Sequence, residues 1–201
     1  PLDNISNRLI KRIFDIVFSS LVILFLLSWL FPIIALIIKL DSKGPVFFRQ
    51  LRTGVDNEIF NCLKFRTMQI NEHADSMQAK ANDSRISKVG AILRKYNIDE
   101  LPQFFNVLFG DMSVVGPRPH MLKHTDEYSE LIGHYKVRHY VKPGVTGWAQ
   151  VNGYRGLTDE LWKMEGRVNY DREYLKNWNF FWDLKIIYLT VFGKDTYMNA
   201  M

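Results

Sequence analysis

The longest apolar stretch of the chain lies near its N-terminus. No charged residue occurs from Ile16 to Ile38, a run of 23 residues that reads IVFSSLVILFLLSWLFPIIALII. At about 1.5 Å of rise per residue, a helix of this length reaches across a hydrocarbon core about 30 Å thick. No small-residue cleavage site follows, which argues against a cleaved signal peptide. The pattern therefore predicts a membrane helix.

Two features leave the path of this helix through the membrane open. Basic residues flank both of its ends, namely Lys11 and Arg12 before it and Lys39, Lys43, Arg49 and Arg52 after it. Because basic flanks favour the cytoplasmic side, both ends are expected there. Pro32 removes one helical hydrogen bond and predicts a kink inside the run. A plain span and a re-entrant helix over residues 11–40, which enters and leaves by one leaflet, both remain open.

A second apolar stretch runs from Phe180 to Phe192, and Asp183 and Lys185 interrupt it. It is too short to cross a bilayer. Its aromatic residues and the preceding Trp178 favour a helix that lies flat at the membrane interface. A core helix of the soluble part is the alternative.

Short elements alternate with turns between these two stretches. Val46–Phe48 and Ile59–Phe65 read as the strands of a small hairpin around a turn at 54–57. Residues 69–85 read as a loop or a weak helix, and helical spacing predicts helices over Ile86–Tyr96, Leu101–Leu108 and His120–Tyr140. The predicted fold class is α+β, mostly helical with a small β-hairpin.

Glycine and proline interrupt the second half of the chain. Met112–Val115 is expected to be extended, residues 116–119 irregular, and residues 141–156 a glycine-rich loop. Thr158 is expected to cap a further helix, with Asp159 and Glu160 in its first turn, where acidic side chains complement the helix dipole.

Length and composition narrow the class of protein. The 201 residues suit a single domain, 1–201, and the net charge is +5. Basic residues beside an apolar segment favour contacts with anionic lipid or phosphate, and we expect no nucleic-acid partner. Cys62 is the only cysteine, so no internal disulfide can form and a reducing compartment is expected. The chain starts at Pro1 rather than Met, so we expect a preceding region.

The acidic pair Asp99–Glu100 has two interpretations. An acidic pair before Leu101–Pro102 is typical of a helix N-terminus, and taken alone this interpretation is favoured. Basic residues that the fold could bring nearby are Lys64, Arg66, Arg94, Lys95 and Arg118. Phosphoryl transfer needs a nucleophile, a divalent cation and basic groups for the developing charge. The set suggests this chemistry without establishing it.

Several sequence blocks resemble one family in the right order along nearly the whole chain. IDELPQFFNVLFGDMSVVGPRP at 98–119 is similar to the signature of the bacterial sugar transferases, the monotopic polyprenyl-phosphate phosphoglycosyl transferases. KRIFDIV at 11–17, GPVFFRQLRTG at 44–54, KFRTM at 64–68, KPGVTGWAQVNGYRG at 142–156 and NYDREYLKNWNFFWDLKII at 169–187 match further blocks.

This resemblance implies a reaction and roles for particular residues. Asp99 would attack the β-phosphate of a UDP-sugar, release UMP and hold a covalent phosphosugar, which undecaprenyl phosphate then takes. Glu100, together with Asp99, would bind Mg²⁺. The resemblance implies that three basic residues bind phosphates, namely Lys64, Arg94 and Arg118. Weaker candidates for contacts with the nucleotide or sugar are Gln150, Asn152 and Arg155.

The resemblance also implies a location and an architecture. The family's membrane segment is a re-entrant helix broken at a Ser-Pro pair, and here Phe31 precedes Pro32. We therefore expect a re-entrant helix over 11–40, interfacial helices, and a cytoplasmic catalytic part over 41–201, at the bacterial inner membrane and in contact with its lipids. Members of this kind start exopolysaccharide, O-antigen or capsule assembly, and a hexose is the expected sugar. A homo-oligomer is left open.

Two other functions compete with this one. A membrane-associated glycosyltransferase would use the same donor but release UDP, and it needs no aspartyl nucleophile. In a non-catalytic scaffold docked to the membrane, Asp99–Glu100 would merely cap a helix.

Overall fold

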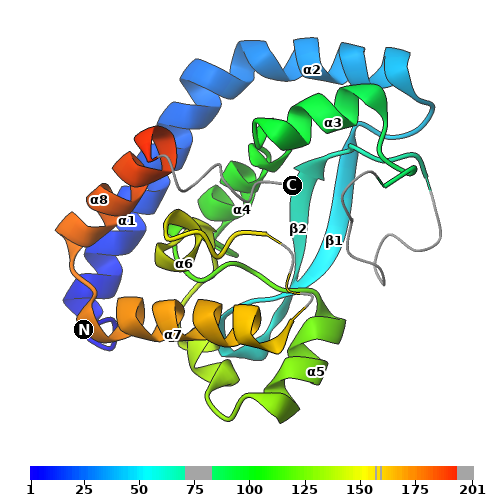
Figure 1. Ribbon diagram of the computed structural model, residues 1–201. Helices are drawn as coiled ribbons and strands as arrows, with labels where there is room; N and C mark the ends of the chain where they lie inside the picture. The colour runs from blue at the N-terminus through cyan, green and yellow to red at the C-terminus, as the bar shows by residue number, and fades with distance from the viewer. Residues whose placement is uncertain (71–82, 157, 159, 194–201) are drawn as a thin grey trace.

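A computed structural model describes residues 1–70, 83–156, 158 and 160–193. Figure 1 shows a long N-terminal helix beside a body of shorter helices and the β1–β2 hairpin. The described residues form two small sheets of two strands each. Part of the segment predicted to be a loop or weak helix, residues 69–85, lies outside the described residues. The mostly helical fold with a small antiparallel β-hairpin is confirmed.

The N-terminal helix is one continuous element with an irregular turn inside it. Helix α1 (Ile5–Val22) passes through a π-helical turn (Ile23–Leu27) into α2 (Ser28–Asp41). Figure 1 shows α1 and α2 meeting at an angle. Pro32 lies inside α2, and the π-helical turn ends one helical turn before it. The Ser28 hydroxyl donates to the Leu24 carbonyl at 2.5 Å, so a carbonyl of the irregular turn keeps a partner.

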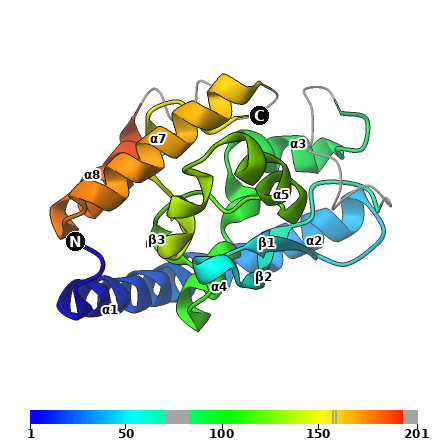
Figure 2. The same cartoon turned by 90° about the horizontal axis from the view of Figure 1, so that it is seen from below.

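This helix is long and apolar enough to cross a membrane by length and composition, yet little of it is covered by protein. Only 17% of its most apolar window is buried. Figure 2 shows α1 and α2 along one side of the protein, with β1, β2 and α4 lying against them. A long apolar face therefore stays uncovered.

The basic residues at the start of α1 bind the body of the protein. The Lys11 ammonium lies 2.6 Å from the buried carboxylate of Asp183 in α8 (Phe180–Phe192). The Arg12 guanidinium donates to the carbonyls of Val107 and Leu108 at 2.6 and 2.8 Å, near the end of α4 (Gln103–Phe109). Both residues, which precede the apolar run, therefore hold α1 against the body of the protein.

The hairpin pairs β1 (Phe47–Thr53) with β2 (Ile59–Phe65) in antiparallel register, with Phe47 opposite Phe65. The range of β2 agrees with the prediction, whereas β1 is longer than the predicted 46–48. Residues 56 and 57 in the turn have positive φ. Phe31 of α2 stacks on Phe47 at 5.3 Å between ring centroids, which fixes α2 on the hairpin.

A second, parallel sheet joins β3 (Ser113–Val115) to β4 (Gly144–Thr146). The prediction of a plain glycine-rich loop over 141–156 is therefore wrong, because β4 and the short helix α6 (Trp148–Val151) lie within it. A Cβ on Gly144 would meet the Gly116 nitrogen at 2.1 Å. The glycine is needed because the two backbones nearly touch.

The remaining helices differ from the prediction mainly at their ends. Helix α3 covers Lys88–Lys95, and α4 ends at Phe109, directly before Gly110, whose φ is +103°. The predicted helix over 120–140 is two elements, α5 (Leu122–Leu131) and a 3-10 turn (Tyr135–Tyr140), with Gly133 between them. Helix α7 (Leu161–Asn177) starts after the expected Thr158 cap, whose carbonyl instead accepts from Tyr128 at 2.6 Å. Asp159 lies outside the described residues.

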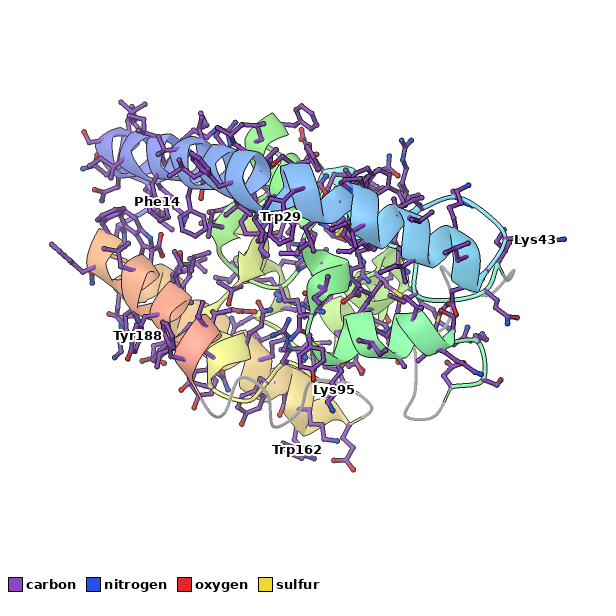
Figure 3. The ribbon with its side chains drawn as sticks, turned by 90° about the horizontal axis from the view of Figure 1, so that it is seen from above. Phe14, Trp29, Lys43, Lys95, Trp162 and Tyr188 are labelled. Atoms are coloured by element: carbon purple, nitrogen blue, oxygen red, sulfur yellow. The ribbon has the colours of Figure 1, made fainter. Side chains whose placement is uncertain are left out.

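Helix α8 has the predicted range and serves two purposes. Asp183 and Ile186 are fully buried, and the indole of the buried Trp178 donates to Asp183 at 3.2 Å. Phe181 and Tyr188 are exposed by 78% and 61%. Figure 3 shows Phe14 between α1 and α8, and Tyr188 on the outer side of α8. One face of the helix therefore belongs to the core, and its other face remains apolar and uncovered.

Candidate active site

The acidic pair lies in a short turn of its own between α3 and α4. Asp99 and Glu100 belong to a 3-10 turn (Ile98–Glu100) that follows Asn97, whose φ is +57°. Both side chains are buried. Helix α4 starts at Gln103 without a side-chain cap. Neither side chain therefore caps α4, although both lie in the first turn of the 3-10 segment that precedes it.

Glu100 binds three basic side chains that come from distant parts of the chain. Its Oε1 lies 2.7 Å from Lys64 Nζ of β2 and 2.7 Å from Arg118 Nη2. Arg118 also donates to Oε2 at 3.2 Å, so its guanidinium holds the carboxylate with two hydrogen bonds. Arg155 Nη2 lies 3.4 Å from Oε2.

The two neighbouring carboxyls have opposite pKa shifts. Burial raises the pKa of Asp99 above its ordinary value, although Lys64, Arg94 and Arg118 act in the opposite sense. Burial alone would also raise the pKa of Glu100, but its basic partners outweigh burial and hold that pKa well below the ordinary value. Among the described residues, no hydrogen bond or ion pair joins the Asp99 carboxylate. Asp99 is thus the buried acid whose oxygens are not used by the fold.

Arg94 approaches the site from α3. Its Nε donates to the Thr67 hydroxyl at 2.8 Å, and its charge lowers the pKa of Asp99. Helix α3 can lie this close because Gly90 faces the Thr67 carbonyl, where a Cβ would meet the oxygen at 2.0 Å. Arg94 therefore lies within electrostatic reach of Asp99, and its binding of phosphate stays a prediction.

Two other predicted residues have local roles in this structure. The amide of Gln150 is buried and donates to the Val145 carbonyl at 3.3 Å, and its Oε1 has no partner among the described residues. Asn152 donates to the Trp148 carbonyl at 2.8 Å, at the end of α6. In the described part of the chain, no hydrogen bond joins either side chain to the acidic pair, in contrast to Arg155 from the same segment.

Two basic residues that the sequence placed near the pair lie elsewhere. The guanidinium of Arg66 donates to the carbonyls of Ser42, Lys43 and Pro45, so it fixes the chain after α2. Lys95 lies over the ring of Tyr96, at 5.7 Å from the centroid. The positions of both side chains are therefore explained by contacts within the protein, and neither needs a bound substrate.

The acidic pair has a donor set that suits Mg²⁺. This ion is usually held by one or two carboxylates together with substrate phosphates, rather than by a cage of protein ligands. Within the described part of the chain, no group of three or more His, Cys, Asp or Glu residues could hold a metal. No described residue forms a hydrogen bond or ion pair with the Asp99 carboxylate, and the contacts at Oε2 of Glu100 are long, at 3.2 and 3.4 Å. The residues therefore fit an ion that arrives with a phosphorylated substrate.

A layer of buried polar residues behind the site was not predicted. His120, Arg138, Arg167 and Asp171 lie against the segments that carry Arg118 and Arg155. In the sequence each charged member reads as a solvated surface residue, because a charge on a helix gives no local sign of burial.

Comparison with known proteins places the chain in a family. Residues 6–194 match the model of the bacterial sugar transferases, and the chain belongs to this family. A UDP-glucose:undecaprenyl-phosphate glucose-1-phosphate transferase from Klebsiella pneumoniae is 54% identical over 193 residues, which are 96% of this chain and 41% of that protein. The chain thus spans about two-fifths of the length of that relative.

Other relatives differ in length and in the sugar that they are named for. The exopolysaccharide production protein PSS of Rhizobium leguminosarum bv. phaseoli is 44% identical, over 94% of this chain and 97% of its own length. A UDP-N-acetylgalactosamine-undecaprenyl-phosphate N-acetylgalactosaminephosphotransferase from Aeromonas hydrophila is 42% identical, over 90% of this chain and 43% of that protein.

Proposed function

We propose that this protein transfers a sugar-1-phosphate from a UDP-sugar to undecaprenyl phosphate through a covalent intermediate on Asp99. The observation that carries the proposal is that the two carboxylates of the acidic pair have different surroundings. Glu100 is neutralised by three basic side chains, whereas the neighbouring Asp99 keeps its oxygens unengaged among the described residues. A nucleophile needs free lone pairs beside groups that stabilise phosphate charge.

In the first half of the reaction, an oxygen of Asp99 attacks the β-phosphorus of the UDP-sugar. The new bond between this oxygen and the β-phosphorus makes an acyl phosphate. The bond between the β-phosphorus and the bridging oxygen breaks, and UMP leaves with that oxygen. Lys64 and Arg118 already point at the pair, at 2.7 Å from Glu100, and can share their donors with the phosphate oxygens. Arg94 adds positive charge on the side of Asp99.

In the second half, a phosphate oxygen of undecaprenyl phosphate attacks the same phosphorus. The bond to Asp99 breaks, the carboxylate is regenerated, and the sugar leaves as a lipid-linked diphosphate. Asp99 and Glu100 would hold Mg²⁺, which supplies charge neutralisation on the phosphate oxygens. Burial of the pair excludes water, which protects the acyl phosphate from hydrolysis.

We propose further that the N-terminal helix enters and leaves the membrane by the same leaflet. Its two halves contact one and the same body, α1 through Lys11 and Asp183, and α2 through Phe31 and Phe47. A straight span would carry one half away from that body. The uncovered faces of this helix and of α8 would then lie in the cytoplasmic leaflet of the inner membrane, where the polyprenyl phosphate is carried.

A hexose is the proposed sugar, and the product would serve as the first lipid-linked unit of exopolysaccharide, O-antigen or capsule assembly. This part of the proposal rests on relatives named for glucose and for exopolysaccharide production. The relative named for N-acetylgalactosamine makes an N-acetylated sugar the variant to compare.

The test is to incubate the protein with Mg²⁺, undecaprenyl phosphate and either UDP-glucose or UDP-N-acetylgalactosamine. We expect UMP release and transfer of sugar phosphate to the lipid. Without the lipid acceptor, mass spectrometry of the peptide that contains Asp99 should show an added hexose phosphate. Asp99→Asn should lose at least about 10³-fold in rate, since an amide is not a competent nucleophile here. Release of UDP, or full activity of Asp99→Asn, would refute the mechanism.

A further inference from the structure

Two further arginines bind the backbone at or beside the two arginines that contact Glu100. Arg167 of α7 donates from Nε to the Tyr154 carbonyl at 2.9 Å and from Nη2 to the Gly156 carbonyl at 2.8 Å. These carbonyls lie on either side of Arg155, so one guanidinium fixes the backbone before and after that residue. Lysine, whose ammonium is a compact point charge, lacks this planar fork.

Arg138 likewise binds the backbone of Arg118, the second arginine that contacts Glu100. Its Nη2 donates to the Arg118 carbonyl at 2.8 Å and lies 2.8 Å from the carboxylate of Asp171. Arg118 stands between two prolines, whose fixed φ angles limit its backbone. With the carbonyl anchored as well, the remaining freedom of Arg118 is in its side chain.

His120 connects the two supports. Its Nε2 lies 2.9 Å from Arg138 Nη1 and 3.1 Å from Arg167 Nη1, and its Nδ1 lies 2.6 Å from the Tyr135 hydroxyl. Burial and the two arginines hold the pKa of His120 well below its ordinary value. A neutral imidazole can accept a hydrogen bond, so it can lie between two cations without adding a third charge.

The supporting cluster, His120, Arg138, Arg167 and Asp171, carries more positive charge than its packing needs. Its two arginines are nearly fully buried with one carboxylate, Asp171, while Arg118 lies close enough to lower the pKa of Arg167 further. Buried like charges are costly, and neutral donors could satisfy backbone carbonyls equally well. Such an excess is understandable where the neighbouring site takes up a polyanion.

We infer that Arg167 and Arg138 are positioning residues for the donor diphosphate: they set the places of Arg155 and Arg118, and through them the geometry around Glu100. This inference rests on the proposed function. It adds a role for two arginines that touch neither carboxylate of the acidic pair.

The test is a double-mutant cycle between Arg167 and Arg155. Arg167→Lys keeps the charge but loses the two-carbonyl clamp, and we expect kcat/KM for the UDP-sugar to fall about 10- to 100-fold. If Arg167 acts through Arg155, then Arg155→Ala/Arg167→Lys is no slower than Arg155→Ala alone, to within about twofold. Arg94→Lys/Arg167→Lys should instead show the product of the two single effects, because Thr67 rather than the supporting cluster holds Arg94.

A matched control is Arg172→Lys, an exposed arginine on the same helix, which should keep wild-type kinetics. Multiplicative effects in the Arg155 and Arg167 cycle would overturn the inference and leave only a contribution to folding. If Arg167→Lys does not fold, the cycle of Arg138→Lys with Arg118→Ala makes the same test. A wild-type protein that neither binds nor turns over UDP-sugars overturns the proposed function and the inference with it. An active wild type with a multiplicative cycle overturns the inference alone.

Discussion

Removing the charge from each member of the acidic pair should change the free energy of unfolding in opposite directions. At neutral pH, Glu100→Gln removes the partner of Lys64, Arg118 and Arg155 and leaves three cations in a buried site. Breaking a buried ion pair in this way costs about 3–5 kcal/mol. Asp99→Asn removes a carboxylate whose pKa is raised by burial, so it should stabilise the protein by about 1 kcal/mol.

The sign of each pH dependence follows from the direction of the pKa shift. The folded pKa of Glu100 lies below its ordinary value of 4.5, so its contribution is fully present above that pH and is lost as the pH falls towards the folded pKa. The folded pKa of Asp99 lies above its ordinary value of 3.8, so ionising it destabilises the fold as the pH rises through the folded pKa. Acidification should therefore reduce the difference in the free energy of unfolding between the wild type and each variant, Glu100→Gln and Asp99→Asn.

The assay is urea unfolding in mild detergent between pH 4 and pH 8, followed by tryptophan fluorescence. Glu58→Gln is the matched control, because Glu58 is exposed and a surface change of this kind stays within about 0.5 kcal/mol. The reasoning is refuted if Asp99→Asn destabilises the protein as much as Glu100→Gln does at pH 7. It is equally refuted if the Glu100→Gln deficit grows on acidification.

Three further changes test other parts of the structure. Gly90→Ala places a Cβ 2.0 Å from the Thr67 carbonyl, so it should destabilise the fold by at least about 2 kcal/mol in a thermal melt, and wild-type stability would contradict the packing of α3. Lys11→Met strands the buried Asp183, so it should cost about 3–5 kcal/mol on urea unfolding and much less in an Asp183→Asn background; additive costs would refute the pairing. Phe181→Ser on the uncovered face of α8 should weaken liposome binding about tenfold in a sedimentation assay without changing unfolding, and unchanged binding would remove this face from the lipid surface.

Strong hydrophobic runs made some elements predictable. The range of α8 follows from its dense apolar residues, and the range of β2 from its apolar run between a turn and the polar residues after Phe65. Most of β1 was missed because Arg49 to Thr53 contains several polar residues, whose side chains find partners in residues 119–125, far away in the sequence. A three-residue strand such as β4 has no periodicity to detect, so it was read as part of a loop.

The candidate site depends on contacts that no local pattern contains. Lys64, Arg118 and Arg155 lie 36, 18 and 55 residues from Glu100 in sequence, yet all three reach it. The resemblance to a family supplied these residues, and local spacing could not. Lys11 and Arg12 precede the apolar run, as the sequence shows, but nothing in the local pattern predicts their contacts with α8 and α4.

The charge balance of the site favours the proposed catalysis over a purely structural role. Lys64, Arg94, Arg118 and Arg155 face two carboxylates, and all four lie within electrostatic reach of one or both. In a scaffold this excess of buried positive charge would only lower stability, because each cation loses hydration without a full partner. In an enzyme that takes up a diphosphate, the substrate supplies the missing negative charge. The same balance explains the opposite pKa shifts in the pair: the basic side chains hold Glu100 ionised, whereas burial dominates at Asp99, the proposed nucleophile.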